Sequence, residues 1–133
     1  MVRDILIRIG YAAVSLFARF EDSPMAEYEQ VIRRNFFGQV YGARAALRRF
    51  RAQGSGVLIN VSSMVAAAGQ PYTSAYVASK WAVRGLSECL RMELMDAPGI
   101  HVCTVLPATI DTPIFQHAAN YTGRAVRAMP KSA

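Results

Sequence analysis

The sequence has few of the residues that build metal sites or covalent cross-links. It contains two cysteines, Cys89 and Cys103, which have neither a Cys-x-x-Cys spacing nor a paired histidine. We therefore expect no bound metal and no disulfide framework. Reduced thiols are typical of a cytoplasmic protein, and both cysteines are expected to pack as small hydrophobes. The predicted location is the cytoplasm.

Long apolar runs are missing as well. No stretch of about 20 apolar residues occurs, which argues against a membrane span and a membrane partner. The apolar segment 5–18 is interrupted by Arg8 and preceded by Asp4. These charges favour a buried strand followed by a loop over a signal peptide.

Acidic residues are scarce beside basic ones, and the formal net charge is +6. Six arginines gather in one predicted helical stretch: Arg33, Arg34, Arg44, Arg48, Arg49 and Arg51. A basic helix can bind nucleic acid, but no groove-reading motif accompanies this one. We favour a solvated helix face near a phosphate-bearing cofactor and expect no nucleic-acid partner.

The apolar residues that are present form short runs. They make up 53% of the chain, and charged residues make up 18%, which indicates one globular domain over residues 1–133. Runs rich in β-branched residues predict strands at 5–9, 57–61 and 100–106. The segments between these strands are long enough to hold helices.

Two long helices are predicted between the strands. The first begins at Ser23-Pro24, where a capping hydroxyl precedes a proline at the first helical position, and it ends at Gly54. The second covers residues 74–96. Its apolar stripe consists of Val83, Leu86, Leu90 and Leu94. A short helix follows near Pro113. This alternation predicts parallel strands joined by crossover helices.

Tyr76 and Lys80 are the first candidates for chemistry. Their i, i+4 spacing places the phenol and the ammonium on one face of a helix. A nearby ammonium favours the phenolate, and a tyrosine with a lowered pKa can exchange a proton with an alcohol or carbonyl oxygen. The alternative is an ordinary surface pair.

Two serines follow the predicted strand 57–61 directly. Ligands of open α/β sheets bind beyond the carboxyl ends of the strands, where Ser62 and Ser63 lie. Serines there can also cap a turn, and we expect one to cap and the other to face substrate. A hydrolase using Ser63 and Lys80 is disfavoured, because neither a nucleophile elbow nor an oxyanion loop is evident.

These motifs together resemble the short-chain dehydrogenase/reductase family. The stretch GVLINVSSMVAAAGQPYTSAYVASKWAVRGLSECLRMEL is similar to the core of that family, with Ser63, Tyr76 thirteen positions later and Lys80 four beyond. The resemblance extends upstream through FEDSPMAEYEQVIRRNFFGQVYGARAAL, where Asn35 falls on a helix asparagine of the family. Downstream it reaches LPATIDTPIF, which is similar to the segment beside the nicotinamide.

The resemblance implies a role for each matching residue. Tyr76 would be the general acid/base, and Lys80 would hold the nicotinamide ribose and lower the pKa of Tyr76. Ser63 would hold the substrate oxygen. Asn35 would support a water leading from Lys80 to solvent, or it is simply a polar residue that disturbs its helix. The expected nicotinamide contacts are Pro107, Ala108, Thr109, Ile110 and Thr112.

The implied activity is the interconversion of a small-molecule alcohol and a ketone or aldehyde, with NAD or NADP as cofactor. The hydride is the cofactor's chemistry, and the protein supplies position and electrostatics. The resemblance also implies a homo-oligomer that forms through the two long helices. Apolar residues on both helices would supply that interface, because they present more apolar surface than one sheet face can cover. They are Ala75, Ala78, Trp81 and Ala82 on the second helix and Phe36, Phe37 and Tyr41 on the first.

Three departures from the family pattern are present. The glycine-rich turn that binds pyrophosphate is absent, Gly10-Tyr11-Ala12-Ala13 stands where the family has Asn-Asn-Ala-Gly, and Ala108 replaces a glycine. We therefore expect a partial Rossmann-like α/β domain with about three parallel strands and two crossover helices, a truncated catalytic domain. The alternative is a non-catalytic remnant that cannot hold the dinucleotide.

Overall fold

The computed structural model describes residues 6–11, 13–108 and 113–126. Its main sheet contains β1 (Ile7–Gly10), β3 (Gly56–Val61) and β4 (Ile100–Val105). All three strands run parallel, in the order β1-β3-β4. The predicted set of three parallel strands is confirmed, and only Ile5 of the predicted first strand lies outside the described residues.

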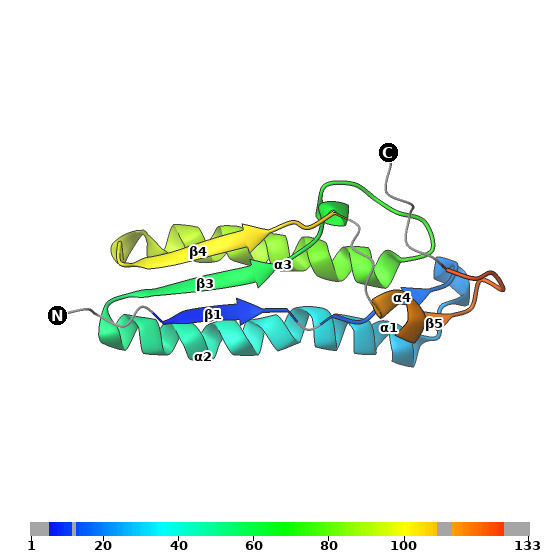
Figure 1. The fold of residues 1–133 in the computed structure, drawn as a ribbon, viewed down its shortest axis with the longest axis horizontal. Helices are drawn as coiled ribbons and strands as arrows, with labels where there is room; N and C mark the ends of the chain where they lie inside the picture. The colour runs from blue at the N-terminus through cyan, green and yellow to red at the C-terminus, as the bar shows by residue number, and fades with distance from the viewer. Residues whose placement is uncertain (1–5, 12, 109–112, 127–133) are drawn as a thin grey trace.

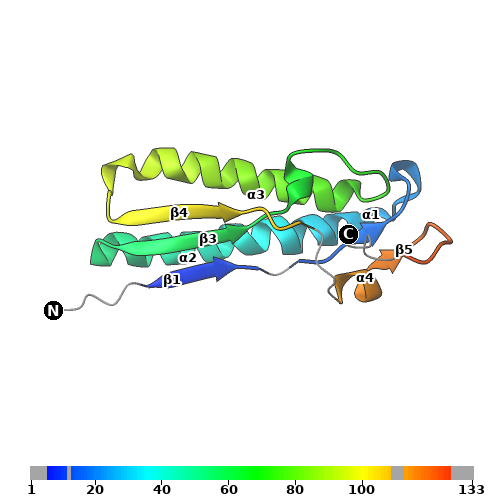
Figure 2. The same cartoon turned by 45° about the horizontal axis from the view of Figure 1, so that its top comes forward.

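The helices lie behind one face of this sheet (Figures 1 and 2). The connection from β1 to β3 contains α1 (Met25–Ile32), a π-helical segment (Arg33–Phe37) and α2 (Gly38–Gln53), and α3 (Ser74–Glu93) joins β3 to β4. Both crossover helices are confirmed. A π-helical turn inserts one extra residue into a helix. The sequence predicted one continuous helix without such a turn.

The core between helices and sheet is small and tightly packed. It gathers buried side chains of α2, β3, β4 and the 3-10 turn after α3 (Leu94–Asp96), namely Ala43, Phe50, Leu58, Leu94, Ile100 and Val102. A side chain at Gly56 would place its Cβ 2.2 Å from Cγ of Phe50. Only glycine therefore allows the Phe50 ring to lie against the start of β3.

The start of the first predicted helix differs from the prediction, and its end matches it. Ser23 does not cap α1: its hydroxyl donates to the carbonyl of Arg19 at 2.9 Å, and Pro24 occupies the capping position. Proline has no N–H to lose at a helix start, so it is tolerated there. Gly54 ends α2 in the left-handed conformation, with φ of 80°, as predicted.

The inner face of α3 is more polar than predicted. Val83 and Leu94 are buried as expected, but Leu86 and Leu90 are only partly buried. Ser87 is fully buried instead, and it accepts a hydrogen bond from Nδ2 of Asn60 at 2.9 Å. Small polar residues fill this face because β3 presents a polar side chain to it.

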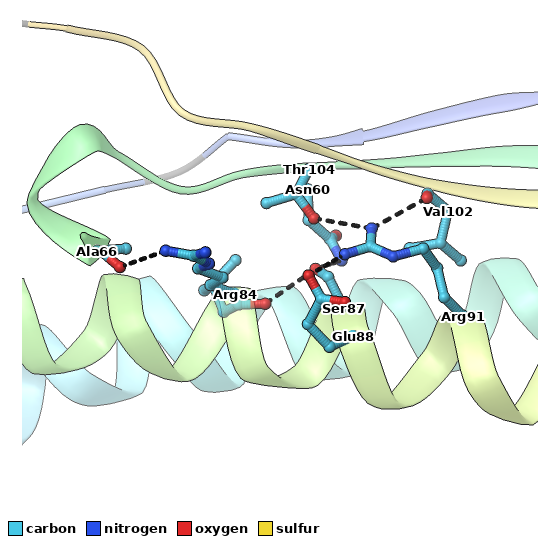
Figure 3. Close-up of polar contacts among 9 residues, drawn as sticks. Asn60, Ala66, Arg84, Ser87, Glu88, Arg91, Val102 and Thr104 are labelled. Carbon is cyan, nitrogen blue, oxygen red and sulfur yellow. Dashed lines mark hydrogen bonds and ion pairs between the residues drawn. The ribbon is translucent and has the colours of Figure 1, made fainter.

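Arg91 ties the far end of α3 to the sheet (Figure 3). Its guanidinium donates to the carbonyl of Val102 at 3.2 Å and to Oγ1 of Thr104 at 3.1 Å. The same group pairs with Glu88 one turn earlier in the helix. Arg91 therefore covers part of the β4 edge that has no neighbouring strand among the described residues.

The other face of the sheet is open. No described element covers it, and Ile7 and Ile9 are 61% and 56% exposed. Cys103 lies on the same face and is exposed, as is Cys89 on the outer side of α3. The prediction that both cysteines pack as small hydrophobes is wrong, because neither has a packing layer over it.

A second, two-stranded sheet lies beyond the carboxyl ends of the main strands. It pairs β2 (Leu16–Phe17) with β5 (Ala119–Asn120) in parallel, and α4 (Ile114–His117) precedes β5. The short helix near Pro113 is confirmed, whereas this sheet was not predicted. None of the helices in the described part of the chain is both long and apolar enough to cross a membrane.

Candidate active site

A pocket of about 500 Å³ lies where the main strands end. Its wall includes Tyr11 after β1, Ser62 and Ser63 after β3, and Pro107 after β4. Carboxyl ends of parallel strands are the usual ligand position in open α/β sheets. The predicted catalytic residues on β3 and α3 thus reach one common space.

Tyr76 and Lys80 come together in the first turns of α3. The ammonium Nζ of Lys80 lies 5.5 Å from the centroid of the Tyr76 ring, within range of a cation–π contact. Nζ also donates to the carbonyl of Val61, the last residue of β3, at 3.2 Å. The pair is therefore part of a pocket wall, and the alternative of an ordinary surface pair is wrong.

Burial dominates the protonation of this pair. It raises the pKa of Tyr76 above 10.0, a hydrogen bond with Ser63 lowers that pKa, and Tyr11 raises it again. Burial also lowers the pKa of Lys80 to about 8. The predicted lowering of the tyrosine pKa by Lys80 is wrong for this structure, because the ammonium lies over the ring and loss of hydration outweighs the Ser63 contact.

The two serines after β3 both bond to the backbone. The Ser62 hydroxyl donates to the carbonyl of Lys80 at 2.8 Å, which fixes the strand end to α3. The Ser63 hydroxyl accepts from the amide of Val65 at 3.3 Å and also bonds Tyr76. Ser63 is thus both a cap and a pocket residue, whereas one role for each serine was expected.

Asn35 lies behind the pocket, fully buried in the π-helical segment. Its side chain accepts from the amide of Val14 and donates to the carbonyl of Val14, both at 2.8 Å. It also donates to the Ser79 hydroxyl at 3.1 Å, and Ser79 donates to the carbonyl of Tyr76 at 2.6 Å. Asn35 lies where the helix departs from α-helical geometry, as the alternative interpretation of a polar residue in a disturbed helix describes. Its role toward a water stays a prediction.

The segment expected to hold nicotinamide is described only in part. Pro107 and Ala108 line the pocket, and the carbonyl of Pro107 accepts from the amide of Met64 at 3.1 Å. Ala108 does not have a positive φ, so its methyl group introduces no backbone strain. Thr109, Ile110 and Thr112 lie outside the described residues.

At the end of β1, where the sequence departs from the family pattern, the side chain of a residue from α2 lies against the strand. Gln39 donates to the carbonyl of Val61 at 3.1 Å, and its Oε1 would lie 3.0 Å from a Cβ at Gly10. Tyr11 reaches the pocket from the same segment. The sequence reading missed Gln39, Tyr11 and Ser79. For Ser79 the signal was its position three residues after Tyr76, on the same side of a helix.

An aromatic pair forms the apolar end of the pocket. The rings of Phe17 on β2 and Phe115 on α4 have centroids 6.5 Å apart. The sequence reading missed both residues, because the β2–β5 pairing that brings them together joins segments about a hundred residues apart.

The parallel sheet with its crossover helices is a Rossmann-like α/β fold. A family model described as short chain dehydrogenase matches residues 4–122, and the chain belongs to the short-chain dehydrogenase/reductase family. The uncharacterized oxidoreductase YxnA of Bacillus subtilis (strain 168) is 36% identical over 115 residues, which cover 85% of this chain and 32% of that protein.

Solved structures show the same fold. ElxO with NADP bound is similar with a TM-score of 0.78 and 27% identity, over 84% of this chain and 45% of that one. 4-Hydroxyisoleucine dehydrogenase complexed with NADH and succinate has a TM-score of 0.73 and 25% identity, over 77% and 48%. The chain spans about a third of YxnA and less than half of each solved structure.

Proposed function

We propose that the protein interconverts an alcohol and a ketone or aldehyde by hydride transfer with NAD or NADP, and that Tyr76 is the general acid/base. One observation carries the proposal: Tyr76, Ser63 and Lys80 meet at a pocket beyond the strand ends. The cofactor assignment is supported by the NADP-bound and NADH-bound structures that share the fold.

The hydrogen-bonding capacity of Lys80 fits a contact with the ribose of the cofactor. An ammonium has three donors, and within the described residues that of Lys80 makes one hydrogen bond, to Val61. A buried ammonium needs further acceptors, which ribose hydroxyls would supply. Tyr76 would contact the same ribose, and Pro107, Ala108, Thr109, Ile110 and Thr112 would face the nicotinamide. When bound, the cofactor supplies or accepts the hydride.

The proton steps belong to Tyr76 and Ser63. In reduction, the Tyr76 hydroxyl gives its proton to the carbonyl oxygen of the substrate, and in oxidation it takes the proton back. The Ser63 oxygen already accepts from the amide of Val65, and its one hydrogen, which faces Tyr76 before substrate binds, would bond the same substrate oxygen. A tyrosine pKa above 10.0 keeps the acid form present at neutral pH.

The test of this function is turnover of a carbonyl compound with reduced nicotinamide, measured in a longer version that also carries the family's glycine-rich segment, because the chain alone is expected to bind the cofactor weakly. Tyr76→Phe should lower turnover by about 10²–10⁴-fold, the usual contribution of general acid–base catalysis. Tyr72→Phe is the matched control, since Tyr72 is 49% exposed and does not line the pocket. Near-wild-type turnover of Tyr76→Phe would exclude the proposed role.

The second candidate is a chain that does not hold the dinucleotide by itself, since these 133 residues contain no Gly-x-x-x-Gly-x-Gly run. Such a run places pyrophosphate at a helix N-terminus. We expect this chain alone to bind NAD(H) and NADP(H) weakly or not at all by isothermal titration. Micromolar binding would remove this candidate from consideration.

We also propose a cytoplasmic homo-oligomer that forms through the long helices. Phe37 at the end of the π-helical segment is 42% exposed and Tyr41 on α2 is 67% exposed, with ring centroids 6.3 Å apart, and Trp81 on α3 is 47% exposed. Exposed apolar patches of this kind mark interfaces. A monomer by light scattering at high micromolar concentration would contradict this assembly.

A further inference from the structure

The pocket has two chemically different ends. At one end Ser63, Tyr76 and Lys80 present the hydroxyls and the ammonium described above. The other end, formed by β2 and α4, is apolar, and the side chains that line it include Phe17, Ile114 and Phe115. A ligand held by its oxygen at Ser63 and Tyr76 extends toward this second end.

The apolar end of the pocket also has few charged side chains around it. Of the described residues that line the pocket, none is Asp, Glu or Arg. Lys80 lies at the hydroxyl end, against Val61 and the Tyr76 ring, where the proposed cofactor ribose takes its remaining donors. His117 also lines the pocket, but it is exposed to solvent. A charged substituent placed among Phe17, Ile114 and Phe115 would lose its hydration without gaining a partner.

The apolar wall is a built feature of the fold. The β2–β5 pairing places Leu16 beside Ala119 and Phe17 beside Asn120. The amide of Tyr121 donates to the carbonyl of Phe17 at 2.7 Å, which continues the ladder. These backbone bonds hold Phe17 and α4 together, so the aromatic pair is fixed before any ligand arrives.

We propose that the substrate is a ketone or alcohol whose reacting carbon carries an uncharged aliphatic or aromatic chain, and that Phe17 and Phe115 select this chain. This inference rests on the proposed function for the position of the reacting oxygen. It assigns specificity to a part of the pocket that the acid–base chemistry does not use.

Binding of two matched ketones to the purified chain tests the proposal. In 4-phenyl-2-butanone the carbonyl is separated by two methylenes from a phenyl ring, and in levulinate it is separated by two methylenes from a carboxylate. Saturation-transfer NMR and isothermal titration at physiological salt should show the phenyl ketone binding at least about tenfold more tightly, the size of effect expected for small changes in an apolar pocket.

Variants locate the effect. Phe115→Ala should weaken binding of the phenyl ketone by about tenfold, and Phe115→Leu should recover most of it. The control is Phe20→Ala, because Phe20 is 71% exposed and outside the pocket. Circular dichroism and the melting temperature show whether each variant is folded. If Phe115→Ala is not, the comparison of the two ketones on the unaltered chain still tests the proposal.

The outcomes separate this inference from the proposed function. Equal or tighter binding of levulinate, binding of neither ketone, or no effect of both Phe115 variants overturns the substrate class. Selective binding of the phenyl ketone without turnover supports the substrate class and counts against the function. Turnover that prefers levulinate supports the function and rejects the aromatic wall as its selector.

Discussion

The two halves of α3 use buried polar groups in different ways. In the first half, Lys80 keeps donors that no described group accepts, and Tyr76 and Ser63 have hydroxyls at a pocket. In the second half, Ser87 and Arg91 direct their hydrogen bonds to the sheet and to neighbouring turns of the helix (Figure 3). Spare hydrogen-bonding capacity marks the reactive half, and saturated hydrogen bonds mark the structural half.

The largest expected effect comes from the anchor of the reactive half. Asn35→Ala leaves both the amide and the carbonyl of Val14 without their partner. Each lost partner costs about 1–3 kcal/mol, so urea unfolding should show a loss of about 2–6 kcal/mol. Binding of 4-phenyl-2-butanone should weaken as well, because Val14 lines the pocket.

Asn120→Ala is the control for that change, since Asn120 is exposed and bonds only near neighbours. It should alter stability by much less than Asn35→Ala. An Asn35 variant with wild-type stability would show that the loop after β1 is held by other contacts.

A pH-dependent effect should follow from Lys80. Its pKa is about 8 in the folded protein and 10.5 when unperturbed, so between these values the unfolded chain binds more protons. The free energy of unfolding therefore rises with pH across this window. The wild-type value minus the Lys80→Met value should increase by up to about 3 kcal/mol from below pH 8 to above pH 10.5.

Denaturant unfolding of both proteins across this pH range measures that difference. The other titratable groups are present in both proteins, so their contributions to the difference largely cancel. A difference that stays flat or falls with pH would show that the ammonium of Lys80 is hydrated in the folded state.

A smaller effect is expected in the structural half. Ser87→Ala leaves Nδ2 of Asn60 buried without an acceptor, at a cost of about 1–3 kcal/mol by urea unfolding. Ketone binding should stay unchanged, because neither residue lines the pocket. Adding Asn60→Leu should recover stability, since the unpaired donor is then gone. A Ser87 variant that loses ketone binding would break the division between the two halves.

The smallest effect concerns the exposed ion pair. Glu88→Gln removes the charge that faces Arg91, whose side chain is 35% exposed beside 60% for Glu88. Pairs this exposed contribute about 0.2–1 kcal/mol, so the melting temperature should change little and the loss should shrink in high salt. A loss above 2 kcal/mol by urea unfolding would require that Glu88 orients Arg91 on the strand edge.

The fold was predictable where the pattern was local. Runs of β-branched residues marked β3 and β4, and Gly54 marked the end of α2. The β2–β5 sheet was not predictable, because two-residue strands carry no periodicity and their pairing is long-range. The exposure of Cys103 was not predictable either, because the residue pattern of a strand does not tell whether a second layer covers the sheet.

The site divides in the same way. Tyr76, Lys80 and Ser63 were found from spacing and from their position after a strand, and the structure places all three at the pocket. Gln39 and Ser79 act through backbone contacts whose partners lie on other elements, which single-residue patterns do not encode. The direction of the Tyr76 pKa depended on burial, which is a property of the fold.

The open face of the main sheet has a calorimetric consequence. Ile7 and Ile9 are already more than half hydrated in the folded chain, so unfolding wets less new apolar surface there than in a sheet covered on both sides. Heat capacity change and denaturant sensitivity both scale with newly wetted area. The stability curve of this chain is therefore flatter with temperature than its length suggests, with a broad maximum and a shallow response to urea.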